Sequence, residues 1–164
     1  MPEEDLPGSI TRALSVAVVL ATAMASSVII YLVIAAFLVS QNRGAPLGHA
    51  TMPALLPPVL SVVAVMMLVA AEVLYRIQLR QLRERTEPAD PDQVLTAYRQ
   101  TLLVSLALRE STAVFGLVLT LLSGNLWWCA VFAAVSLAAM ALIWPTRRLM
   151  EELVGSDTPP ISPT

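Results

Sequence analysis

Four long apolar segments, separated by shorter polar ones, dominate the pattern of this chain. They cover about residues 13–39, 55–75, 98–122 and 126–144. The first is apolar on all faces, which is typical of a helix surrounded by lipid and not of a helix on the surface of a soluble protein. A helix needs about 20 predominantly apolar residues to cross the hydrocarbon layer of a bilayer. The pattern therefore predicts four transmembrane helices.

Polar segments with glycine or proline mark the connections between these spans. Gln41 to Pro53 predicts a loop, and Ser123 to Asn125 predicts a tight turn. Residues 76–97 are rich in arginine; the second helix is expected to continue into them, and the third to begin with Pro91 in its first turn. The predicted organisation is an acidic N-terminal segment (1–12), one transmembrane domain (13–145, with the loop 76–97) and a disordered cytoplasmic tail (146–164).

The arginines predict how the chain is oriented. Arginine is enriched on the cytoplasmic side of membrane proteins. One side of the predicted bundle holds eight arginines: Arg12, Arg76, Arg80, Arg83, Arg85, Arg99, Arg147 and Arg148. The other side holds only Arg43. Both termini and the loop 76–97 are therefore predicted to be cytoplasmic. The fold class is all-α, an up-down bundle of four transmembrane helices.

Composition supports the membrane class and excludes several kinds of site. The chain is 57% hydrophobic and 13% charged, with a mean hydropathy of +0.73, whereas globular proteins are about 25% charged. All basic residues are arginine and none is lysine, which favours a GC-rich bacterial source. The membrane is then predicted to be the bacterial inner membrane. One cysteine, Cys129, allows no intrachain disulfide. With a single histidine, a zinc site is not expected. No cofactor and no nucleic-acid partner is predicted.

Two adjacent charged residues, Arg109 and Glu110, lie close to the middle of the third span. An ionisable group at that depth costs at least about 2.5 kcal/mol. Neighbours on a helix point about 100° apart, so the two cannot neutralise each other face to face. At least one therefore needs a partner on another helix, on another subunit or in an aqueous cavity. The candidate polar partners are Ser26, Ser27 and Glu72.

Two hypotheses follow for this pair. In the first, Arg109 and Glu110 fix helix packing in a structural or accessory subunit of a membrane complex. In the second, Glu110 carries protons or cations through the membrane, in a homo-oligomer. The first predicts that Glu110 meets a helix of its own chain, and the second that it faces a subunit interface or an aqueous path. Ser26 and Ser27 are explained either by packing or by solvation of Glu110.

The remaining charged residues suggest contacts at the membrane surface. Glu72 lies four residues before Arg76, a spacing that favours an ion pair on one helix. Arg76, Arg80 and Arg83 share a helix face that would suit anionic lipid headgroups, although the cytoplasmic enrichment of arginine explains them as well. No nucleophile triad, phosphate loop or Cys-x-x-Cys motif occurs in the sequence, and no enzymatic activity is predicted.

The third span also carries a local resemblance to a known family. Glu110, Ala113, Phe115, Gly116 and Leu117 resemble the ion-carrying helix of rotary ATP synthase c subunits, in which a glutamate precedes small residues, an aromatic residue and Gly-Leu. The resemblance implies that Glu110 is a carboxylate that binds a proton or sodium. The whole pattern also resembles small uncharacterised four-span bacterial membrane proteins.

Overall fold

The computed structural model describes residues 6–41, 54–84 and 91–155. These residues form five helices and no strand. The helices are α1 (Leu6–Gln41), α2 (Leu56–Arg83), α3 (Pro91–Ser123), α4 (Trp127–Leu142) and α5 (Arg147–Gly155). The chain is therefore all-α over its described part, as the sequence predicts. The expected loop 41–53 lies mostly outside the described residues.

Three of the helices are long and apolar enough to cross a membrane. Their qualifying stretches are Ile10–Gln41, Leu56–Leu82 and Gln93–Ser123. Helix α4 is apolar but has 16 residues, which is about 24 Å at 1.5 Å per residue and shorter than a hydrocarbon layer of about 30 Å. The described helices thus have the character of a multi-pass membrane protein.

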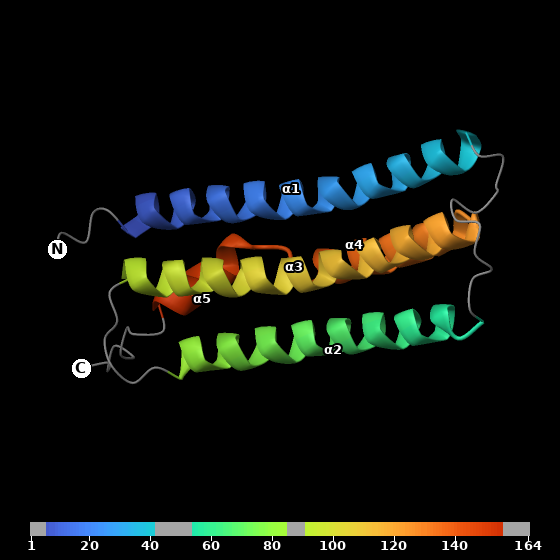
Figure 1. Cartoon of the computed structure of the whole chain (residues 1–164). Helices are drawn as coiled ribbons and strands as arrows, with labels where there is room; N and C mark the ends of the chain where they lie inside the picture. The colour runs from blue at the N-terminus through green and yellow to red at the C-terminus, as the bar shows by residue number, and fades with distance from the viewer. Residues whose placement is uncertain (1–5, 42–53, 85–90, 156–164) are drawn as a thin grey trace, which may run out of the picture.

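Helix α3 lies at the centre of the structure. It packs along α1, α2 and α4, and α4 also packs against α1. Helices α1 and α2 lie on opposite sides of α3 and have at most marginal contact with each other (Figure 1). Consequently, α1, α2 and α4 each join the structure mainly through their contacts with α3.

Small residues let the helices approach α3 closely. The buried side of α1 is formed by Ala13, Ala17, Ala21, Val28 and Ala35, at spacings of four and seven residues. That spacing keeps them on one helix face. Small side chains at helix interfaces are common in membrane proteins, because tight packing drives association where the lipid is as apolar as the side chains.

The tightest approach is between α3 and α4. A Cβ atom added to Gly116 would lie 2.5 Å from Cβ of Phe132 and 3.1 Å from the carbonyl oxygen of Trp128. Glycine is therefore required at this crossing. The turn that follows also uses glycine, since Gly124 has a φ of 68° and its N–H donates to the carbonyl of Thr120 at 2.8 Å.

The prediction that residues 146–164 form a disordered tail is wrong for residues 147–155, which form α5. Met150 and Leu153 of α5 are buried, and the helix packs against α1 and α3. The apolar residues lie three apart and face the bundle, which provides the packing that a nine-residue helix needs in order to form. Residues 156–164 lie outside the described part.

The N-terminal boundary also differs from the prediction. Helix α1 begins at Leu6, so residues 6–12 of the segment 1–12 belong to the first helix. The first residues of α2 and α3 agree with the sequence prediction. Helix α2 begins at Leu56 with proline in its first turn, and α3 begins at Pro91.

Candidate functional site: a polar cluster around the centre of α3

Arg109 is buried and donates hydrogen bonds to three groups. Its Nη2 lies 2.7 Å from Oε2 of Glu72 on α2. Its Nη1 donates to the carbonyl oxygen of Ala139 on α4, and its Nε lies 3.3 Å from Oγ of Ser105 on α3 itself. The guanidinium thus has one carboxylate partner and two neutral ones, which compensates its removal from water.

Glu110 points to a different helix. Its Oε1 accepts hydrogen bonds from Oγ of Ser27 at 2.5 Å and from the hydroxyl of Tyr31 at 2.8 Å, both on α1. The side chain is half-buried. Among the described residues, no cation lies within ion-pair distance of this carboxylate. Its partners are therefore two neutral hydroxyl groups.

A further hydrogen bond ties α4 to the backbone of α3 at the same level. Oγ of Ser136, which is fully buried, donates to the carbonyl oxygen of Arg109 at 2.8 Å. We call Arg109, Glu110 and their partners the polar clasp; the partner side chains from other helices are those of Ser27, Tyr31, Glu72 and Ser136. Through two adjacent residues, the clasp connects α3 to α1, α2 and α4.

Glu72 joins the clasp to the exposed side of α2. Its Oε1 lies 2.6 Å from Nε of Arg76, one turn further along α2, while its Oε2 binds Arg109. The side chain of Glu72 is 37% exposed and that of Arg109 is 3% exposed. Glu72 thus places one negative charge between a buried and an exposed guanidinium.

Not all of the candidate residues predicted from the sequence belong to the polar clasp. It brings Arg109, Glu110, Ser27 and Glu72 into the clasp, whereas Ser26 is exposed and donates to the carbonyl of Thr22 on its own helix. The sequence predicted the ion pair between Glu72 and Arg76. It gave Glu72 only as one of three possible partners of Arg109 and Glu110, without deciding which residue it contacts.

The three arginines proposed to face lipid headgroups lie on the last turns of α2. Arg76 and Arg80 are largely exposed, and Arg80 is paired with Glu84 at 2.6 Å. Arg83 ends α2, and its side chain lies outside the described part of the structure.

Two clasp residues were missed by the sequence reasoning. Tyr31 lies four residues after Ser27 and therefore on the same face of α1, a signal that could have found it. Ser136 carries no comparable signal, because a lone serine in an apolar helix is ordinary. Among the described residues, no group of three or more His, Cys, Asp or Glu side chains that could hold a metal ion occurs.

Comparisons with known proteins add no relative. A scan against protein-family models, a search of curated proteins and a search of solved structures each returned no match.

Proposed function

We propose that this chain is a structural or accessory subunit of a membrane complex and that the polar clasp fixes the packing of its helices. The observation that carries the proposal is that Arg109 and Glu110, adjacent in sequence, bind different helices of the same chain. The packing hypothesis expects this arrangement, because it requires Glu110 to meet a helix of its own chain.

The energetics of a membrane interior support a packing role. Hydrogen bonds between transmembrane helices contribute about 0.6 kcal/mol on average, and up to about 1.7 kcal/mol. The clasp contains several such interhelical hydrogen bonds and one interhelical ion pair, all at Arg109 and Glu110 of α3. Because α1 and α2 have little contact with each other, these bonds help to fix the position of both helices against the central one.

The orientation and location of the protein belong to the same proposal. The start of α1, the end of α2, the start of α3 and α5 lie at one end of the bundle (Figure 1). These helix parts carry the described arginines Arg12, Arg76, Arg80, Arg99, Arg147 and Arg148. We place this end in the cytoplasm and the bundle in a bacterial inner membrane. Helix α4, the shorter apolar helix, is proposed as the fourth span, and no catalytic activity is assigned.

A second candidate function has its own supporting observation. Oγ of Ser27 lies within hydrogen-bond distance of both Oε1 of Glu110 and the carbonyl of Met24, at 2.5 and 2.7 Å. A hydroxyl has one proton, so Ser27 can donate to an ionised Glu110, or accept from a protonated Glu110 and donate to Met24. The local geometry thus accommodates both protonation states of the carboxylate. This favours proton or cation translocation through Glu110, in agreement with the resemblance to ATP synthase c subunits.

Reconstitution into liposomes distinguishes the two functions. Purified protein is placed in vesicles with an internal pH-sensitive dye, and a potassium gradient with valinomycin supplies the driving force. The structural proposal expects the same proton flux as in protein-free vesicles, with and without sodium, for the wild-type chain and for Glu110→Gln. A flux that the wild-type protein supports and Glu110→Gln abolishes would establish translocation instead. Ser26→Ala is the matched control, because Ser26 lies beside the clasp without contacting it.

A further inference from the structure

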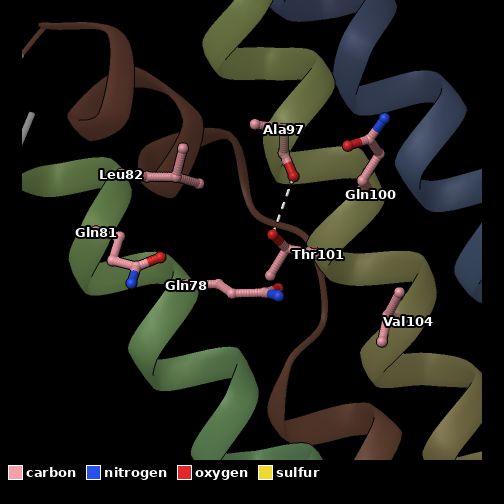
Figure 2. Close-up of a pocket in the computed structure, with 7 residues that line it drawn as sticks. All are labelled: Gln78, Gln81, Leu82, Ala97, Gln100, Thr101 and Val104. Atoms are coloured by element: carbon pink, nitrogen blue, oxygen red, sulfur yellow. Dashed lines mark hydrogen bonds between the residues drawn. The ribbon is translucent and has the colours of Figure 1, made fainter.

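A pocket separate from the polar clasp lies between α2 and α3. It has a volume of about 330 Å³, within the range of about 300–1,000 Å³ that is typical of sites for small molecules. Figure 2 shows its lining: Gln78, Gln81 and Leu82 from α2, and Ala97, Gln100, Thr101 and Val104 from α3.

The polar groups of this pocket have unused hydrogen-bonding capacity. The side-chain amides of Gln78, Gln81 and Gln100 form no hydrogen bond with any other described residue. Thr101 donates to the carbonyl of Ala97 at 2.9 Å, which leaves its hydroxyl oxygen as an acceptor. Each glutamine amide offers two N–H donors and one carbonyl acceptor. The pocket therefore presents several donors, without a net charge, to a ligand.

The depth of the pocket is that of a lipid headgroup. Thr101 directly precedes the apolar run that begins at Leu102, and Gln78 follows the apolar part of α2. Along α3, Thr101 is eight residues from Arg109, or roughly 12 Å at 1.5 Å per residue. Since half of a hydrocarbon layer is about 15 Å, a clasp near mid-membrane places the pocket at the boundary between hydrocarbon and headgroups.

An apolar surface leads away from the pocket along α3. Val104 lines the pocket and is 44% exposed. Leu103, Val114, Val118 and Leu122 are also exposed and lie within an arc of about 100° on the same helix. We call these five residues the open face of α3. Its residues are between 37% and 45% exposed.

We propose that the glutamine pocket binds the phosphodiester of a membrane phospholipid, with an acyl chain along the part of the open face nearest the pocket, Leu103 and Val104. Amide N–H groups would donate to the phosphate oxygens, and the apolar residues would contact the chain. Of the open face, Leu103 and Val104 lie between the pocket and the level of Arg109. Polar groups at the membrane boundary, followed by apolar residues on the mid-membrane side, match the order of groups in a lipid molecule. A transmembrane helix of a partner would not need the three glutamines at one end.

Native mass spectrometry of the detergent-purified full chain tests the proposal. The wild-type protein is incubated with phosphatidylglycerol and with diacylglycerol of identical acyl chains. The expected result is retention of phosphatidylglycerol and about tenfold weaker retention of diacylglycerol, which lacks the phosphate. In the variant Gln78→Leu/Gln81→Leu/Gln100→Leu, retention of phosphatidylglycerol should fall to the level of diacylglycerol.

The matched control is Gln41→Leu, an exposed glutamine at the other end of the bundle, which should retain phosphatidylglycerol like the wild type. Gln78→Glu keeps the size of the side chain and sets a negative charge against the phosphate, so it should weaken retention without removing polar groups. Circular dichroism checks the helix content of each variant. Unchanged retention in the triple variant, equal retention of the two lipids, or displacement of the lipid by millimolar glycerol 3-phosphate would overturn the proposal.

Discussion

Arg109 and Glu72 form an ion pair between the central helix and α2, with 2.7 Å between Nη2 and Oε2. Thirty-seven residues separate the two in sequence, and the register of α2 against α3 brings them together. Because α2 packs mainly on α3, this pair is the principal polar link that holds α2 in place. Glu72 also binds Arg76 through its other oxygen.

Removing Glu72 should strongly destabilise the fold. Glu72→Ala leaves the buried Arg109 guanidinium without a counter-charge, and breaking a buried pair in this way costs about 3–5 kcal/mol. The 37% exposure of Glu72 places the expected loss at the lower end of that range. Thermal unfolding in detergent, followed by circular dichroism, measures the loss. Arg76→Ala removes an exposed pair and should cost less than about 1 kcal/mol.

A double variant measures the direct interaction between Glu72 and Arg109, apart from the other contacts that each residue makes. Glu72→Leu/Arg109→Leu removes both charges, so it should be more stable than Arg109→Leu and Glu72→Leu would predict by simple addition. Additive losses would contradict a direct coupling between the two residues.

The two hydroxyl groups that bind Glu110 should each make a small contribution to the free energy of unfolding. Ser27→Ala and Tyr31→Phe each remove one hydrogen bond to Oε1, and each should lower the unfolding free energy by about 0.6–1.7 kcal/mol. Ser26→Ala is the control, because the Ser26 hydroxyl donates to a carbonyl of its own helix and, among the described residues, does not contact Glu110. Equal effects of Ser26→Ala and Ser27→Ala would show that the contact of Ser27 with Glu110 does not stabilise the fold.

Gly116 should tolerate no side chain. In Gly116→Ala the new methyl group would lie 2.5 Å from Cβ of Phe132, so α3 and α4 would have to separate. Overpacking of this kind costs about 1–3 kcal/mol, measured as a lower unfolding midpoint. Gly8→Ala is a matched control on α1, where an added Cβ meets nothing within 4 Å. Its expected effect is neutral or slightly stabilising, because alanine favours the helix.

Helix α5 should contribute to stability through Met150. The side chain of Met150 is fully buried, and truncation of a buried methionine to alanine costs about 2–5 kcal/mol. Glu152→Ala, which alters an exposed pair with Arg148, should change stability by less than about 1 kcal/mol. A neutral Met150→Ala variant would mean that α5 does not pack on the bundle in solution.

The sequence was sufficient to predict an all-helical chain with long apolar helices, because length and hydropathy decide this directly. It was also sufficient to show that Arg109 and Glu110 need partners at their depth. Which partners they have depends on the register between helices that are distant in sequence. Ser26 and Ser27 are chemically identical, and only the rotation of α1 about its axis decides which one reaches Glu110.

Two further features could not be predicted from the pattern of apolar residues. The hydropathy of α5 is too low to suggest a span, yet Met150 and Leu153 lie three residues apart and form one buried face, as in an amphipathic helix. The central place of α3 depends on small residues on its neighbours, such as Ala17 and Ala71, which are fully buried. Alanine in an apolar segment does not show which helix it will pack against.

The reactivity of Glu110 toward a hydrophobic carbodiimide in native membranes tests the packing account most directly. Labelling is measured by mass spectrometry across pH, with and without sodium, and Glu110→Gln identifies the labelled site. If Ser27 and Tyr31 hold the carboxylate in a permanent packing contact, Glu110 should remain unlabelled at every pH, and the double variant Ser27→Ala/Tyr31→Phe should expose it to the reagent. Labelling of the wild-type protein that falls with rising pH or with added sodium would contradict this account and establish Glu110 as an ion-binding carboxylate.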